Sequence, residues 1–326
     1  MNSSYDVIVI GGGAAGLSGA VALARSRRSV LVVDAGEPRN APAGHVHNYL
    51  GREGTPPGQL LAIGREEARS YGAEIVSGTV TSATRRTGGF TVALADGRTT
   101  RARRLLVTTG LVDELPDVPG VAERWGRDVL HCPYCHGWEA RDRAIGVLAT
   151  NPMAVHQALM WRQLSDDVVV FRHTAGALDT DQLSARGIRV VDGEVAAVRV
   201  EDDAVAGVEL ASGEVVPREV VVVAPRFVAQ AGFLRELGVE VAETEFGSFA
   251  VADPSGATTV PGVWVAGNVA DLRAQVVVSA AAGLMAGAAV NADLIAEDVR
   301  VAREPFSHEV EREVAELVGG PERHGV

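Results

Sequence analysis

The sequence has few cysteines, few aromatic residues and too few basic residues to balance its acidic ones. Its 326 residues include two cysteines, and aromatic residues make up 5% of the chain. Lysine and arginine total 30 against 42 aspartates and glutamates, which gives a net charge of -12. A chain of this charge repels nucleic acid and anionic membranes, so we predict neither as a partner.

Long apolar segments are also missing, because glycine or a charged residue interrupts each run before it reaches transmembrane length. The N-terminal segment YDVIVIGGG lacks the basic region and the cleavage site of a signal peptide, and it is typical of a buried strand that enters a glycine turn. We therefore expect a cytoplasmic protein. In a reducing compartment, two nearby cysteines are more often catalytic, redox-sensing or metal-binding than a permanent disulfide.

The N-terminus carries a complete strand, helix and strand pattern. The apolar run 7–10 leads into a glycine-rich turn, the segment LSGAVALARS repeats small and apolar residues at helical spacing, and SVLVVD ends in Asp34. Gly11 permits a tight turn, Gly13 allows a pyrophosphate to approach the backbone, and Gly16 allows close packing of helix on strand. Asp34 can bind ribose hydroxyls. The pattern predicts a dinucleotide-binding, Rossmann-like domain in a chain long enough for about two domains.

A C-terminal segment completes this picture. Residues 263–266 predict a short strand, followed by a Gly267-Asn268 turn and a helix of small residues. Together with the opening turn and the LLVTTG strand that ends at Gly110, this segment resembles the FAD-binding halves of the low-molecular-weight thioredoxin reductase family. The resemblance covers about residues 5–297 and implies an α/β fold with two dinucleotide-binding domains, the second inserted into the FAD domain.

The layout of that family implies the domain boundaries and the FAD-binding residues of this chain. The implied segments are 1–116 and 239–298 for the two halves of the FAD domain, 117–238 for the inserted NAD(P)-like domain, and 299–326 for a C-terminal helix and tail. The residues implied to bind FAD are Gly11, Gly13, Ala14, Ala15, Gly16, Asp34, Asn48, Gly110, Gly267, Asn268 and Gln275. Asn268 stands where the family usually has aspartate, but an amide can still hydrogen-bond a ribityl or phosphate group. Such proteins are commonly homodimers through the FAD domain.

The inserted segment has a second strand, helix and strand pattern in AIGVLA, residues 152–164 and DVVVF, but its glycine turn is missing. Ala149 and Asn151 occupy the positions of the first two glycines, and their side chains fill space that a pyrophosphate and a close backbone need. NADPH-using relatives carry a basic cluster after the next strand, where only Arg172 remains in FRHT. We predict that conventional NADPH binding is lost.

Both cysteines lie in HCPYCHGWE, residues 131–139. A zinc site is not expected, because residues adjacent to a ligand in sequence seldom reach the same ion. A c-type haem anchor would require an exported protein. A buried inert pair is the alternative, but Pro133 argues against it, because proline favours the first turn of a helix whose N-terminus stabilises a thiolate. The remaining interpretation is a redox dithiol beside a flavin.

The family resemblance implies separate roles for the residues of this motif. Cys135 is the flavin-proximal cysteine, and Cys132 exchanges with the substrate. His136 stands where thioredoxin reductases commonly have an acidic acid/base residue, and an imidazole titrates near neutral pH, so it suits removing a proton from a substrate thiol. His131 is the second candidate for that role.

The motif CPYCHGWE, joined to an FAD domain and a degenerate NADPH turn, resembles the flavin-dependent dithiol oxidases. These relatives close disulfides in small sulfur-containing natural products and give the electrons to oxygen. Three functions stay open: an oxygen-dependent dithiol oxidase, a reductase of thioredoxin or a similar protein disulfide with NADPH or a protein donor, and a redox-sensing flavoprotein. His45, His47, Tyr134 and Trp138 are candidates for the substrate side.

Overall fold

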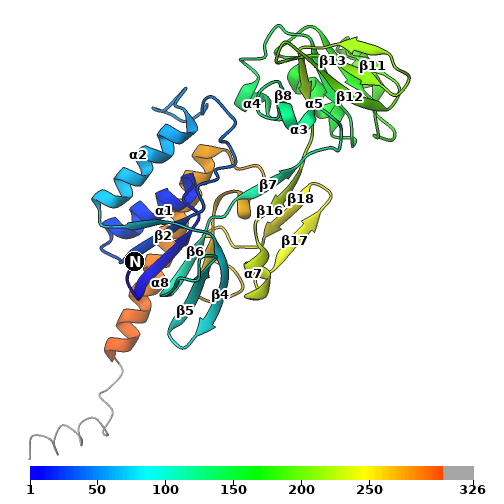
Figure 1. Cartoon of the computed structure of the whole chain (residues 1–326). Helices are drawn as coiled ribbons and strands as arrows, with labels where there is room; N and C mark the ends of the chain where they lie inside the picture. The colour runs from blue at the N-terminus through cyan, green and yellow to red at the C-terminus, as the bar shows by residue number, and fades with distance from the viewer. Residues whose placement is uncertain (304–326) are drawn as a thin grey trace, which may run out of the picture.

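The computed structural model describes residues 1–303 and shows two domains connected by two neighbouring strands (Figure 1). The first domain is built on a seven-stranded sheet in the order β3-β2-β1-β6-β5-β4, with β19 also paired to β6. Its strands are β1 (Ser4–Ile10), β2 (Val30–Asp34), β3 (Glu74–Ser77), β4 (Val80–Arg86), β5 (Gly89–Leu94), β6 (Thr99–Val107) and β19 (Val263–Val265). The two strands of the predicted opening pattern, β1 and β2, therefore lie in the interior of this sheet.

The same domain contains the helices α1 (Ala14–Arg25), α2 (Pro57–Ser70) and α8 (Val276–Arg303) and the short helix η1 (Gly267–Val269). The small residues of α8 serve packing within the chain, since a Cβ added to Gly283 would lie 1.9 Å from the carbonyl oxygen of Ala15 on α1. By length and composition α8 could also cross a membrane, a test that core helices pass as well. Its close contact with α1 identifies it as a core helix.

A four-stranded sheet, β17-β18-β16-β7, adjoins the first domain. It contains β7 (Leu111–Glu114), β16 (Arg226–Ala229), β17 (Val241–Thr244) and β18 (Gly247–Ala250), with helix α7 (Gly232–Glu236) between β16 and β17. Phe233 and Leu234 of α7 belong to the same buried apolar cluster as Ile8 and Leu105 of the central sheet. After the inserted domain, the chain has therefore returned to the first domain by the start of α7.

The inserted domain has a parallel sheet in the order β11-β10-β9-β15-β8. Its strands are β8 (Val129–Leu130), β9 (Ile145–Leu148), β10 (Val168–Phe171), β11 (Arg189–Val191) and β15 (Val220–Val222), and its helices are α3 (Val121–Arg124), α4 (Pro133–His136), α5 (Ala154–Trp161) and α6 (Thr180–Ala185). A smaller antiparallel sheet contains β12 (Val195–Glu201), β13 (Ala204–Leu210) and β14 (Val215–Pro217). Helices cover one face of the parallel sheet and the small sheet covers the other.

The strands β7 and β16 pair antiparallel and connect the two domains (Figure 1). The sequence placed the second crossing at residue 238, whereas this pairing places it between β15 and β16. The valine-rich strand β15 runs into β16 through three residues, Val223, Ala224 and Pro225, so no long loop in the sequence marks the boundary. Helix α8 also runs past the expected boundary at 298 as far as Arg303, and the rest of the predicted tail, residues 304–326, lies outside the described residues.

Candidate redox site

A cavity of about 1510 Å³ extends from the glycine turn of the first domain to the cysteine turn of the inserted domain. It brings together most residues that the sequence singled out. Those that line it are Gly11, Gly13, Ala14, Ala15, Asp34, Gly110, Cys132, Cys135, His136, Gly267, Asn268 and Gln275. Gly16 and Asn48 are not among its lining residues. The two cysteines thus share one cavity with the predicted dinucleotide turn.

The glycine turn shows why each glycine is needed. Gly11 has a φ of 108°, and a Cβ there would lie 2.4 Å from the carbonyl oxygen of Thr108. A Cβ on Gly16 would lie 1.9 Å from the carbonyl oxygen of Gly11, so Gly16 closes the turn from behind. A Cβ on Gly13 would meet nothing within 4 Å, because that position faces the cavity. The turn therefore combines a tight backbone with open space for a ligand.

Asp34 ends β2 beside this turn. One of its carboxylate oxygens accepts hydrogen bonds from the backbone N–H groups of Gly12 at 3.3 Å and Gly36 at 3.2 Å. The sequence did not identify Gly12 as a site residue, although a Cβ there would lie 2.5 Å from the Asp34 carboxylate. The Arg65 guanidinium lies 3.7 Å from the other carboxylate oxygen. Asp34 lines the cavity, where its carboxylate is placed to bind a ribose.

Asn268 begins the approach to α8 at the other end of the cavity. Its amide nitrogen donates to the carbonyl oxygens of Asp271 and Ala274, both at 2.9 Å, and its amide oxygen accepts from Arg39 at 3.3 Å. An aspartate could not donate these two bonds, so the amide shapes the loop that carries Gln275 into the cavity. The volume, the glycine turn and this polar end fit an FAD molecule.

The cysteine turn is formed by the short helix α4. Cys132 precedes it in an extended conformation, and the carbonyl oxygen of Cys132 accepts from the N–H groups of Cys135 and His136, both at 3.2 Å. Both cysteines are half-buried thiols in this structure. A hydrogen bond from the Cys135 thiol lowers the pKa of Cys132 to about 7, assisted by backbone N–H groups and by Arg39, while burial opposes the shift. Cys132 is therefore the first sulfur to ionise.

The same contact acts in the opposite direction on Cys135. Its hydrogen bond to Cys132, followed by burial, raises the pKa of the Cys135 thiol. A reduced pair thus consists of a Cys132 thiolate and a Cys135 thiol at neutral pH. Since the thiolate is the nucleophile in thiol–disulfide exchange, Cys132 is the sulfur of the reduced pair that would attack a disulfide.

Two histidines flank the pair in different surroundings. Burial lowers the pKa of His136, with opposing influence from Glu139, so the ring is neutral and able to accept a proton at pH 7. Burial also lowers the pKa of His131, whose Nδ1 lies 3.0 Å from both the Val223 carbonyl oxygen and the Gln157 amide nitrogen. His131 is thus held by the protein, whereas the described part of the chain supplies no hydrogen bond to the His136 ring.

A second cavity, of about 430 Å³, lies beside the cysteine turn. It is lined by His47, Asn48, Glu53, Gly54, Pro133, Tyr134, Trp138, Glu139 and Leu164. The side-chain amide of Asn48 donates to the carbonyl oxygen of Tyr134 at 2.8 Å, which holds it against α4. Asn48 therefore does not line the main cavity. His47 and Tyr134 line both cavities, so the smaller one adjoins the larger. Of the four substrate-side candidates, His45 lies in the main cavity and Trp138 in the smaller one.

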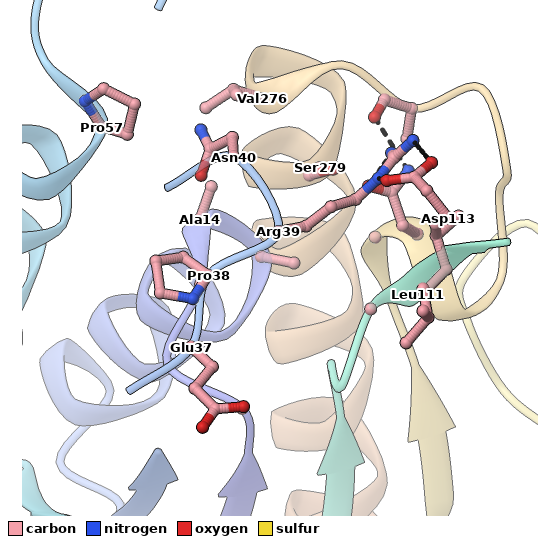
Figure 2. Close-up of a pocket in the computed structure, with 18 of the residues that line it drawn as sticks. Ala14, Glu37, Pro38, Arg39, Asn40, Pro57, Leu111, Asp113, Val276 and Ser279 are labelled. Carbon is pink, nitrogen blue, oxygen red and sulfur yellow. Dashed lines mark hydrogen bonds and ion pairs between the residues drawn. The ribbon is translucent and has the colours of Figure 1, made fainter. Parts of the chain in front are cut away.

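Sequence reasoning missed Arg39. Its guanidinium forms a two-pronged ion pair with Asp113 of β7, with Nε–Oδ2 and Nη2–Oδ1 distances of 2.8 and 2.6 Å (Figure 2). It also lies 5.2 Å from the centre of the Phe227 ring. Arg39 follows Asp34 by five residues, but one arginine among the 30 basic residues of the chain gave no signal of these contacts.

The second nucleotide turn is closed by the protein itself. The Ala149 carbonyl oxygen accepts from the N–H of Ala175 at 3.1 Å, and the Asn151 side chain accepts from the N–H of Met153 at 2.9 Å. Arg172, the expected remnant of a phosphate site, pairs with Asp192 at 2.6 Å. The Met153 N–H and the Arg172 guanidinium, two groups that could meet a pyrophosphate or a 2′-phosphate, therefore already have internal partners.

Comparison with protein families gives a match over most of the chain. Residues 5–283 match the family described as pyridine nucleotide-disulphide oxidoreductase. The chain is 31% identical over 316 residues to thioredoxin reductase tcpT of Claviceps purpurea, covering 90% of this chain and 95% of that one. It is 28% identical over 307 residues to a thioredoxin reductase of Aquifex aeolicus, covering 88% and 92% respectively.

Solved structures agree with these matches. A crystal structure of HlmI superposes with a TM-score of 0.88 at 48% identity, covering 95% of this chain and 98% of that one. An oxidoreductase from Agrobacterium tumefaciens gives a TM-score of 0.85 at 38% identity, covering 90% and 99%. The predicted α/β fold with two Rossmann-like domains and the predicted FAD cofactor are confirmed.

Proposed function

Because the chain belongs to the pyridine nucleotide-disulphide oxidoreductase family and is a thioredoxin reductase-like flavoprotein, we propose that it oxidises a small-molecule dithiol to a disulfide with oxygen as electron acceptor. One observation carries the proposal. The cysteine turn shares the FAD cavity, while the nucleotide turn of the same inserted domain lacks the glycines and has internal partners at Ala149, Asn151 and Arg172. Electrons can therefore enter through sulfur more readily than through a nicotinamide.

The proposed reaction starts from the oxidised pair. His136 accepts a proton from a substrate thiol, and the resulting thiolate attacks Cys132, which forms a mixed disulfide and releases Cys135 as a thiolate. The second substrate thiol then attacks the substrate sulfur of the mixed disulfide, releasing the oxidised substrate and leaving both cysteines reduced. The chemistry that bound FAD would supply is the transfer of this electron pair from the cysteines to oxygen, so the balance would be dithiol plus oxygen to disulfide plus hydrogen peroxide.

The residues of the chain have distinct tasks in this scheme. Gly11, Gly13 and Asp34 would hold the pyrophosphate and ribose of FAD, and Gln275 would reach its flavin end. The hydrogen bond from Cys135 keeps the exchanging sulfur ionised in the reduced pair. The smaller cavity, walled by Tyr134 and Trp138, offers space for the part of the substrate that carries no sulfur.

A second candidate function is the reduction of a protein disulfide. The names of the relatives, thioredoxin reductases of Claviceps purpurea and Aquifex aeolicus, favour it. It needs NADPH bound without the glycine turn, or a protein electron donor. A redox-sensing flavoprotein is a third possibility, in which the cysteine pair changes state without turnover.

Anaerobic stopped-flow absorbance at the flavin band separates these functions. Rapid bleaching by dithiothreitol, followed by recovery in air with one hydrogen peroxide per dithiol, supports the oxidase. Rapid bleaching by NADPH supports the reductase and contradicts our proposal. Slow or absent bleaching by both supports the sensor.

We also propose a cytoplasmic homodimer that contacts neither nucleic acid nor membranes. Exposed apolar side chains on α8, among them Val278, Leu284 and Met285, support an interface on the first domain. Light scattering at micromolar concentration tests the dimer, and a monomer there would reject it without affecting the redox chemistry.

A further inference from the structure

Arg39 connects three separate segments at the point where the two domains meet. It lies in the segment after β2 and forms its ion pair with Asp113, whose side chain is 8% exposed. Its remaining nitrogen donates to Asn268 at 3.3 Å, and its guanidinium stacks over Phe227. Figure 2 shows the Arg39 side chain extending from the segment after β2 toward Asp113. A planar guanidinium with several donors suits such a multiple contact better than an ammonium group does.

The partners of Arg39 belong to the connection between the domains. Asp113 lies on β7 and Phe227 on β16, and the two residues are direct neighbours across the antiparallel pair. These strands form the link through which the inserted domain is attached (Figure 1). Arg39 therefore binds both strands of the link at the same level and ties them to the first domain.

Arg39 also lies close enough to the sulfurs to influence their ionisation. It lowers the pKa of both cysteines, although the hydrogen bond between the thiols has the larger effect on Cys132. The other titratable side chains of this group are Cys135 and His136 on α4, His131 before it, and Asp113 in the pair with Arg39. The charges of Glu139 and His47 act on His136. Because His131 and His136 are held neutral by burial, Arg39 is the permanent positive charge in this group.

We propose that Arg39 is a positioning residue of the redox site, which holds the inserted domain with its cysteine turn over the FAD cavity and brings a positive charge to the cavity that Cys132 lines. The inference builds on the redox role of the cysteine pair in the proposed function, but it does not depend on the electron acceptor. It predicts two separable effects, one on the ionisation of Cys132 and one on the stability of the strand pair β7–β16.

The first test measures the alkylation rate of Cys132 by iodoacetamide against pH, in reduced holoprotein under argon, with mass spectrometry of the Cys132 peptide. Arg39→Gln should move the midpoint upward from about 7, because the thiolate loses a favourable charge. A rise of half a pH unit would slow alkylation at pH 7 by roughly 1.5- to 2-fold through the smaller thiolate fraction. Arg39→Lys should restore most of the midpoint, since it keeps the charge.

The second test measures backbone hydrogen exchange in residues 111–114 and 226–229. Both Arg39→Gln and Arg39→Lys should exchange faster there than the wild type, because lysine cannot form the two-pronged contact. Arg124→Gln is the matched control: Arg124 forms an equally close two-pronged pair with Asp128, at 2.7 and 2.6 Å, within the inserted domain. It should change neither the Cys132 midpoint nor exchange in β7 and β16.

Unchanged alkylation in Arg39→Gln, or an equal shift in Arg124→Gln, would overturn the proposed charge effect. Unchanged exchange in both Arg39 variants would overturn the proposed link. If Arg39→Gln does not fold, Asp113→Asn provides the test, because it removes the countercharge and leaves Arg39 in place. Its midpoint should stay at or below the wild-type value, and a higher midpoint contradicts the proposal. None of these measurements requires turnover, so a protein that fails to oxidise dithiols can still support or contradict the role of Arg39.

Discussion

The two dinucleotide-type turns of this chain each follow the first strand of a strand, helix and strand unit. The first turn leaves open space for a ligand, whereas the second is bonded to its own domain. In the first, a Cβ on Gly13 would enter open cavity, and the tight backbone at Gly11 leaves no room for any side chain. In the second, Ala149 is completely buried and its carbonyl oxygen is bonded to Ala175. A parallel sheet with a following helix does not by itself make a nucleotide site; the turn between them must leave space and unpaired N–H groups.

The inserted domain shows what can remain after such a site is closed. Its parallel sheet still carries the cysteine turn, directly after β8, into the cavity of the first domain. We therefore interpret the inserted domain as a support for two sulfurs and a base. The predictions below examine this division between the two domains.

The largest effect is expected for the cysteines. Cys132→Ser and Cys135→Ser should each abolish dithiol turnover, because exchange and release need two sulfurs. With Cys132 as the exchanging sulfur, Cys132→Ser removes the neighbouring sulfur whose hydrogen bond and charge raise the pKa of Cys135. A Cys135 thiolate should then lie against oxidised FAD, visible as a long-wavelength charge-transfer band. Cys135→Ser should lack the band. A band seen in Cys135→Ser alone would reverse the roles of the two sulfurs.

A smaller but still large difference is expected between the two electron donors. NADPH and NADH, even at millimolar concentration, should bleach the flavin on the order of 100-fold more slowly than a dithiol does, a difference of about 2.7 kcal/mol in activation free energy. Restoring glycine with Ala149→Gly and Asn151→Gly should not recover rapid reduction, because Arg172 stays paired with Asp192. Anaerobic stopped-flow absorbance measures both rates. Fast bleaching of the wild type by either nucleotide would remove the contrast between the two turns.

His136→Ala should slow dithiol oxidation in a pH-dependent manner. A substrate thiol with an ordinary pKa of about 8.5 is only ~3% ionised at pH 7, so we expect a loss of roughly 10-fold there. The loss should shrink as pH rises and the substrate ionises without help. Since burial lowers the pKa of His136, the wild-type base stays deprotonated somewhat below the usual histidine range. The rate profile of the two enzymes from pH 6 to 9 tests this, with FAD content as the control.

If His136→Ala keeps the wild-type rate at pH 7, the base must be another group. His131 is then the next candidate, because its Nδ1 contact to the Val223 carbonyl oxygen fixes the ring orientation. His131→Ala would be expected to show the pH-dependent loss instead. Equal rates in both variants would remove the histidine base from the mechanism.

The sequence predicted the parts of the site that depend on local patterns. The first glycine turn, the strands on either side of it, the cysteine helix and the degenerate second turn all follow from short stretches in which each residue type has a steric reason. The confirmed fold and FAD cofactor rest on these stretches. The second crossing between the domains was misplaced, because strand pairing between β7 and β16 depends on residues more than a hundred positions apart.

Long-range contacts also explain the functional residues that were missed. Arg39 meets Asp113, Phe227 and Asn268, none of which is near it in sequence. Asn48 was expected beside the flavin from its position in the chain, whereas its side chain bonds the Tyr134 carbonyl oxygen on α4. A local pattern identifies a turn or a cysteine pair, but it does not show which distant segment a long side chain reaches.

The smallest predicted effect compares equivalent positions in the two turns. Gly13→Ala should fold as the wild type does, because the φ of -77° at this residue suits alanine and its Cβ would meet nothing within 4 Å. The added methyl group would instead occupy part of the cavity where a pyrophosphate approaches the backbone, and a loss of about 1 kcal/mol corresponds to roughly 5-fold weaker FAD binding. Asn151→Ala, at the corresponding position of the second turn, should leave FAD binding unchanged, because the Asn151 side chain bonds the N–H of Met153 within its own domain. Titration of both apoproteins with FAD, followed by flavin fluorescence, gives the two affinities, and thermal unfolding of the apoproteins shows whether either variant is destabilised. Equal FAD affinities for Gly13→Ala and the wild type would mean that open space at this turn is not what distinguishes it from the closed one.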